Sequence, residues 1–100
     1  MEIDKFGPPE IRGVDTDFDI YFRLNKSEAD TISNPATQAA IAAALTAAGG
    51  PYGAAAAGLI GGYISVIAEH RGASGCSVKL TVRNGLGGVM QMKEFIAEPI

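Results

Sequence analysis

The sequence contains no tryptophan, one cysteine and one histidine. The single cysteine, Cys76, excludes an internal disulfide framework, and its place in an apolar alternation predicts a small buried hydrophobe. The single histidine, His70, excludes two-histidine metal sites and histidine relays. We therefore expect no metal, no other cofactor and no aromatic platform for carbohydrate.

Basic charge is also scarce. Lysine and arginine together number 8 against 11 aspartates and glutamates, and the formal net charge is −3. Because nucleic-acid binding normally needs a basic face, we expect no nucleic-acid partner. Residues 1–6 lack the basic and apolar regions of a signal peptide. The protein is therefore expected to be cytoplasmic as synthesised, and secretion by a non-classical route is left open.

The length of 100 residues suits a single domain that needs neither metal nor disulfide to fold. We predict one domain over residues 1–100. It comprises an N-terminal segment and strand (1–26), a helical hairpin (33–71) and a β-hairpin (76–97).

Two segments alternate between apolar and polar residues, which is the period of a half-buried strand. In residues 17–24 the even positions hold phenylalanine, isoleucine or leucine. In residues 76–83 the even positions hold cysteine, valine or leucine. Both segments are therefore predicted strands with one face toward a core.

A return strand is expected after the second of these segments. Asn84-Gly85 is typical of a tight hairpin turn, while the glycines at 87 and 88 leave a longer loop or a bulge open. The return strand then covers about residues 89–96 and turns Met90 and Met92 inward.

The middle of the chain, residues 31–68, has no charged residue. Asn34 followed by Pro35 is typical of a helix N-cap and its first helical position. The first helix is expected to reach about residue 48, where Gly49 can adopt the left-handed conformation that ends a helix.

The pair Gly50-Pro51 repeats the helix start signal immediately. A second helix is expected to run to residue 69 or 70 and to stop at Gly72. Because so few residues separate the two helices, they should fold back as an αα-hairpin. A single kinked helix is the alternative.

These elements predict an α+β fold, an Ala/Gly-rich antiparallel helical hairpin packed on a small antiparallel sheet, in the order β-αα-ββ. The charged outer faces of the strands would meet solvent. Further short strand pairing near Ile3 or Ile11 is left open.

Small residues recur every four positions in and around the second helix, so they share a helical face. Glycine inside a helix costs about 0.8–1.0 kcal/mol relative to alanine, and the three glycines nearest its centre together cost about 2–3 kcal/mol. A smooth face of this kind allows a very close backbone approach. The predicted helix-packing face consists of Gly53, Ala54, Ala57, Gly58, Gly61 and Gly62.

Three roles for this face are open. It packs two thin helices together within the chain, it is buried against a second copy or another protein, or it meets lipid, where small-xxx-small spacing lets helices associate. In composition alone, the hairpin resembles segments of secreted bacterial peptides and toxins. Insertion is marginal, because a first helix of about 14 residues spans about 21 Å against a hydrocarbon core of about 30 Å.

Polar residues give little indication of catalysis. His70 and Arg71 suit the C-terminal end of the second helix, where positive charge interacts favourably with the helix dipole. Ser74 as a nucleophile paired with His70 is the catalytic alternative.

Two further motifs give only weak indications of a binding site. Asp15, Asp17 and Asp19 have the spacing of a calcium loop but lack its glycine and terminal glutamate, and the apolar residues between them favour a strand. Residues 84–88 are glycine-rich, but a phosphate cradle needs a helix after the loop, and here a strand is expected.

The sequence therefore predicts a non-enzymatic interaction module that self-associates or binds a protein partner through a glycine-zipper-like helical hairpin. The first alternative is a membrane-active, toxin-like protein whose charge-free hairpin inserts into or perturbs a bilayer. A minor alternative is a small hydrolase-like enzyme that uses His70.

Overall fold

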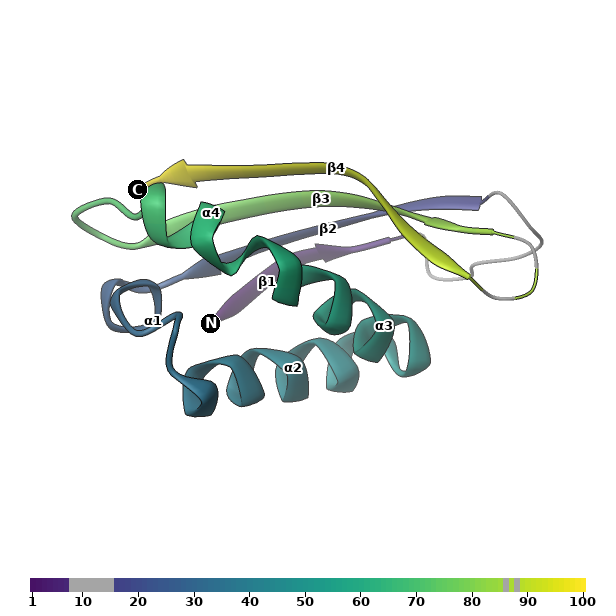
Figure 1. The fold of residues 1–100 in the computed structure, drawn as a ribbon, viewed down its shortest axis with the longest axis horizontal. Coiled ribbons are helices and arrows are strands. Elements are labelled where there is room, and N and C mark those ends of the chain that lie inside the picture. The colour runs from purple at the N-terminus through teal and green to yellow at the C-terminus, as the bar shows by residue number, and fades with distance from the viewer. Residues whose placement is uncertain (8–15, 86, 88) are drawn as a thin grey trace.

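A four-stranded antiparallel sheet carries the helices on one face (Figure 1). The computed structural model describes residues 1–7, 16–85, 87 and 89–100. The strands follow one another across the sheet in chain order: β1 (Glu2–Phe6), β2 (Thr16–Leu24), β3 (Cys76–Asn84) and β4 (Met90–Pro99).

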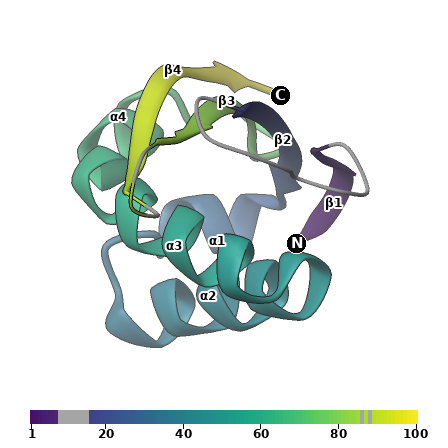
Figure 2. The same cartoon turned by 90° about the vertical axis from the view of Figure 1, so that its right-hand side faces the viewer.

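The helical elements all lie between β2 and β3 in the chain. They are α1 (Lys26–Asp30), α2 (Pro35–Gly49), α3 (Pro51–Ile60), the 3-10 turn η1 (Gly61–Tyr63) and α4 (Ile64–Glu69). Figure 2 shows α2 and α3 beneath the sheet, and Figure 1 shows that they run in opposite directions. The predicted α+β fold with a helical hairpin on an antiparallel sheet is confirmed, and the alternative of a single kinked helix is wrong.

Two elements extend the predicted order. Strand β1 pairs with β2 and places Ile3 opposite Phe22, which confirms strand pairing near Ile3. Ile11 lies outside the described residues. Helix α1 was not predicted, although its signal is in the sequence: Asn25 and Glu28 form a capping box, in which each side chain accepts a hydrogen bond from the other residue's backbone N–H.

The core forms where the alternating strands meet the helices. Strands β2 and β3 pair without a shift from Thr16–Asn84 to Leu24–Cys76, so their apolar residues share one face. Cys76 is fully buried there, as predicted. The helices add few large side chains to this core, mainly Ile41, Leu45, Ile60 and Ile67.

The start of α2 is as predicted, and its end differs by one residue. The Asn34 side chain accepts a hydrogen bond from the backbone N–H of Ala36, and Pro35 opens the helix. The left-handed φ of +58° belongs to Gly50, whereas Gly49 stays helical. Gly49 lies against the ring of Phe6, which would have to shift to make room for a Cβ at this position.

The second helix of the hairpin is not continuous, which corrects the prediction. It changes from α3 to the 3-10 turn η1 at Gly61 and resumes as α4 after Tyr63, whose φ and ψ are −118° and 13°. Glycine loses more backbone freedom in an α-helix than any other residue, so two consecutive glycines weaken the α-helix here and allow a short 3-10 turn.

The loop between β3 and β4 is longer than the tight turn predicted at Asn84-Gly85. Asn84 pairs with Met90, so the return strand begins at Met90 rather than at residue 89. The backbone N–H of Gly85 donates to the carbonyl of Val89 at 2.8 Å and closes the loop. A register shift opposite Thr81 and Val82 places a bulge within β4, away from Gly87 and Gly88, where the sequence had left one open. Met90 and Met92 pack against the core, as predicted.

Candidate functional site

The six residues of the predicted helix-packing face do not act alike. Gly53 is buried at the crossing of α2 and α3, and a Cβ there would overlap the carbonyl of Leu45. Ala57 and Gly61 line a shallow apolar cleft of about 40 Å³ between the two helices. Internal helix packing therefore accounts for Gly53.

Most of the face is nevertheless exposed, including Gly61 at the rim of this cleft. Ala54, Gly58, Gly61 and Gly62 are exposed. A Cβ built on Gly58, Gly61 or Gly62 meets nothing within 4 Å. A methyl side chain at any of these three positions would meet no other part of the chain. Packing within the chain therefore does not explain why they are glycines. We call Ala54, Gly58, Gly61 and Gly62 the outer glycine face.

Helix α2 continues the same kind of surface. Within α2, the buried residues are Ile41 and Leu45, while its exposed positions are mostly alanine. No charged residue occurs from residue 31 to residue 68, all of which the structure describes. The hairpin thus exposes a broad surface of small uncharged residues.

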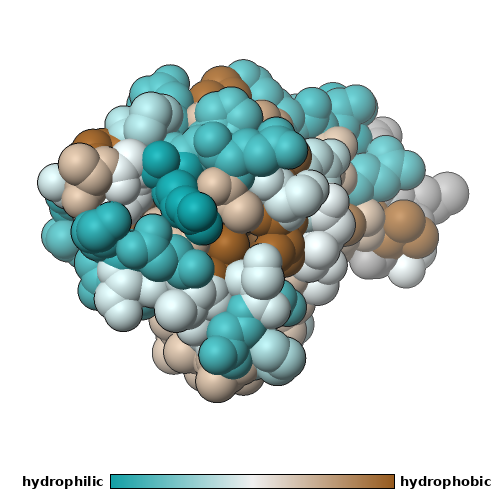
Figure 3. Space-filling view, turned by 60° about the vertical axis from the view of Figure 1, so that its left-hand side comes forward, coloured by the Kyte–Doolittle hydropathy of each residue, from teal (hydrophilic) through white to brown (hydrophobic). Residues whose placement is uncertain are grey.

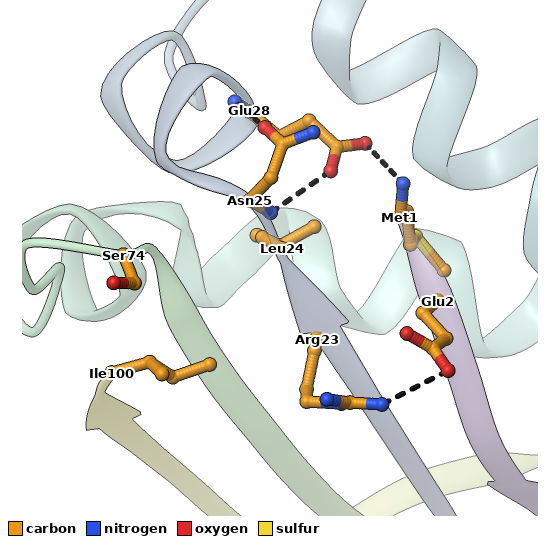
Figure 4. A pocket seen from close by; sticks show the side chains of 8 residues that line it. All are labelled: Met1, Glu2, Arg23, Leu24, Asn25, Glu28, Ser74 and Ile100. Atoms are coloured by element: carbon orange, nitrogen blue, oxygen red, sulfur yellow. Dashed lines mark hydrogen bonds and ion pairs between the residues drawn. The ribbon is translucent and has the colours of Figure 1, made fainter.

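A hollow of about 510 Å³ opens at the end of the molecule where α1 and both chain ends lie. Figure 3 shows this end, where a hydrophobic patch is surrounded by hydrophilic residues. The side chains that line the hollow, drawn in Figure 4, belong to Met1, Glu2, Arg23, Leu24, Asn25, Glu28, Ser74 and Ile100.

Glu28 is the best-connected carboxylate of the hollow. It accepts from the N-terminal ammonium of Met1 at 2.8 Å and from the backbone N–H of Asn25 at 3.0 Å. Partial burial would raise the pKa of Glu28, but these two hydrogen bonds and the ammonium charge outweigh burial and hold the pKa below its ordinary value. Glu28 is therefore a structural anion that joins β1 to α1.

Arg23 is also engaged. Its guanidinium donates to both carboxylate oxygens of Asp4, each at 2.9 Å, and lies 3.0 Å from Glu2. The hydrogen bonds from Arg23 to Asp4, followed by the charges of Asp4 and Glu2, raise the pKa of the guanidinium. The charges lining the hollow are satisfied by one another, which suits a structural joint better than a catalytic centre.

The catalytic alternative gains no support from geometry. The Nδ1 atom of His70 lies 2.8 Å from the carbonyl oxygen of Val66, one turn back along α4. Ser74 lines the hollow, and His70 is not among the residues that do so. His70 thus stands at the helix end where the sequence placed it.

Two of the aspartates with calcium-like spacing, Asp17 and Asp19, lie on strand β2, as expected. Asp17 accepts from Arg83 at 2.8 Å, and this hydrogen bond is the main reason that its pKa is lowered. Asp19 accepts from the hydroxyl of Thr81 at 2.7 Å. Asp15 lies outside the described residues. Among residues 1–7, 16–85, 87 and 89–100, no cluster of three potential metal ligands occurs.

The face of the sheet away from the helices carries these polar contacts. Tyr21 lies at its centre, with the ammonium groups of Lys5 and Lys79 at 5.2 Å and 5.6 Å from its ring centroid. Acidic and basic residues alternate around this row, so the open face has no single charge to attract a charged ligand.

Sequence reasoning missed the edge of the sheet formed by β4. Among the described residues, the large hydrophobic side chains classed as exposed are Val89, Ile96 and Ile100, at 57%, 39% and 45% exposure. All three lie within β4 or next to one of its ends. Nothing in the sequence alone marks these three residues. Their exposure becomes informative only once β4 is known to be an edge strand.

By length and composition, the helical segment Pro51–Glu69, which comprises α3, η1 and α4, could cross a membrane, and 22% of its most apolar stretch is buried. No known protein family matches this chain, and neither the curated proteins nor the solved structures contain a match to it.

Proposed function

We propose that the protein is a non-enzymatic interaction module that associates with a second copy or another protein through the outer glycine face of its helical hairpin. The observation that carries this proposal is the open space around Gly58, Gly61 and Gly62. Glycine lowers helix stability by about 0.8–1.0 kcal/mol per residue relative to alanine. The fold derives no close contact from these glycines, so a contact outside the chain is the natural reason for them.

The chemistry of the surface supports contact with another backbone. Without a Cβ, a helix can be approached more closely, which increases dispersion contacts along the whole face. The absence of charge from residue 31 to residue 68 means that no ionic group loses its hydration when this surface is buried. A charge-free face also allows two identical surfaces to meet without repulsion.

The test is the association state of the purified chain. Sedimentation velocity over a range of concentrations should show a reversible larger species for the native protein. Gly58→Leu should abolish that species, because the leucine holds the partner backbone away. Gly58→Ala is the matched control: it should keep the fold and weaken association less.

A strictly monomeric native protein at high concentration would remove self-association from this proposal. A partner of another kind would then have to bind the native chain and fail to bind Gly58→Leu in a direct titration.

A membrane-active function is a second candidate, favoured by one observation. The apolar helical segment Pro51–Glu69, from α3 through η1 to α4, has 19 residues, enough for a span, and most of it is not buried. The partner helix α2 has 15 residues, or about 22 Å at 1.5 Å per residue, which is shorter than a hydrocarbon core of about 30 Å. Release of a trapped dye from anionic vesicles would support this candidate, and Gly58→Lys should suppress the release.

A further inference from the structure

Strand β4 forms an edge of the sheet that is long and partly apolar. The strand order places β4 beside β3 and at the end of the sheet. Edge strands expose a row of backbone N–H and C=O groups that can pair with another strand. The exposed hydrophobic residues Val89, Ile96 and Ile100 lie along this edge.

The helix-facing side of the same edge is apolar too. Met92 and Phe95 are partly buried and pack against the core. Phe95 stacks on Tyr63 of η1 with ring centroids 4.5 Å apart, and α3 contacts β4. An added strand would therefore find hydrophobic side chains beneath it and would extend the core.

A bulge brings two opposite charges together in the middle of β4. Thr81 is opposite Glu94 while Val82 is opposite Met92, so Lys93 is the extra residue. Glu94 shares the open face with Thr81, whose hydroxyl binds Asp19 there. In a bulge two residues of one strand oppose one residue of its partner, so Lys93 and Glu94 both lie opposite Thr81 and on its face. Lys93 and Glu94 are both exposed and make no ion pair with a described residue.

We propose that β4 pairs antiparallel with β4 of a second copy about a two-fold axis between Lys93 and Glu94. A two-fold axis perpendicular to a sheet keeps each face on its own side, so opposed residues must share a face. The bulge at Lys93 interrupts the alternation of side chains between the two faces. As a result, residues that oppose one another in this register share a face along the strand. It opposes Lys93 to Glu94 twice and Met92 to Phe95 twice, and the remaining pairs are Met90 with Ala97 and Gln91 with Ile96.

Charge complementarity is what selects a second copy as the occupant. The two-fold axis turns the neighbouring charges of Lys93 and Glu94 into two attractive cross-strand pairs. The strand at the opposite edge, β1, cannot form such charge pairs with a second copy. It has 5 residues, and its charges are already paired with Arg23 and Asp19 on the adjacent strand. The edge of β4 is also distinct from the outer glycine face, so the two surfaces can be tested separately.

The test is a charge exchange between two variants. Lys93→Glu alone and Glu94→Lys alone should each weaken dimerisation at least about tenfold, because every opposed pair then carries like charges. Mixing the two variants should restore native affinity in the heterodimer, where each glutamate again meets a lysine. Native mass spectrometry with one variant labelled with ¹⁵N identifies the heterodimer directly.

Each outcome bears on the proposal. A heterodimer as tight as the native dimer supports the edge pairing. A native chain that is monomeric, single variants that dimerise like the native chain, or a mixture that forms no heterodimer would each overturn it. Gly58→Leu distinguishes the surfaces: if it abolishes a dimer that both charge variants retain, association runs through the hairpin alone. Circular dichroism melts of these surface variants check that each is folded.

Discussion

The paired strands β2 and β3 and the helical hairpin contribute to the fold in different ways. In β2 and β3, every second residue from Phe18 to Leu24 and from Cys76 to Val82 is at most 1% exposed. In α2 and α3, most positions hold alanine or glycine and few are buried. The strands use their whole apolar pattern inside the molecule. The hairpin has an apolar, uncharged surface beyond what the fold uses, and that surplus supports the proposal that it contacts another molecule.

The largest loss of stability should come from a substitution in the paired strands β2 and β3. Phe22→Ala removes a buried ring that is 1% exposed and should lower the free energy of unfolding by about 3–5 kcal/mol. Ala43→Ser on the exposed side of α2 should change it by less than about 0.5 kcal/mol. Urea denaturation at constant protein concentration measures both. Equal losses for the two variants would contradict the proposed division of roles.

Two glycines of the same helix should respond in opposite directions. Gly53→Ala should destabilise by about 1–3 kcal/mol, because the new methyl group overlaps the backbone of Leu45. Gly58→Ala should stabilise the isolated chain by about 0.5–1 kcal/mol, because its Cβ meets open space and alanine favours the helix. Thermal unfolding at low protein concentration, where association is minimal, separates the two. A loss of stability on Gly58→Ala would mean that the monomer itself needs this glycine.

A smaller effect should appear where the two regions are joined, at α1. Glu28→Gln keeps a side-chain oxygen for the capping box but loses the charge that faces the ammonium of Met1. The expected loss is about 1–2 kcal/mol near neutral pH. Because the folded protein lowers the pKa of Glu28, this stabilisation is fully present above the ordinary carboxyl pKa and is lost as the pH falls through the lowered value.

The measurement is unfolding free energy followed from about pH 7 down to about pH 2 for the native chain and Glu28→Gln. The two curves should converge at the acid end. Glu69→Gln, at the exposed end of α4, is the matched control, since it makes the same substitution away from the ammonium of Met1. A constant gap between native and Glu28→Gln at every pH would show that the carboxylate charge is not the source of the effect.

Several features were readable from the sequence because they depend on local rules. The alternation in residues 17–24 and 76–83 identified two strands and their buried face. Asn34 and Pro35 identified the start of α2. Helix α1 was missed although Asn25 and Glu28 carry its capping box, because a 5-residue helix has too little periodicity to be recognised.

The sites were less predictable. Small-residue spacing placed Gly53 and Gly58 in one class, and only the position of α2 shows that one is enclosed and the other open. The break at η1 follows from two neighbouring glycines, whose weak helix preference does not by itself say where a helix will tighten. The exposed side chains along β4 acquire meaning from the strand order.

By itself, the sequence determined the alternating strands, the charge-free helical pair and the absence of a disulfide framework, since these depend on residue identity and spacing along the chain. The tertiary structure decided which glycines touch another backbone, which strands form the edges, and how the bulge of β4 places Lys93 and Glu94 on one face. Those features depend on contacts between residues far apart in the chain, and no local pattern encodes them.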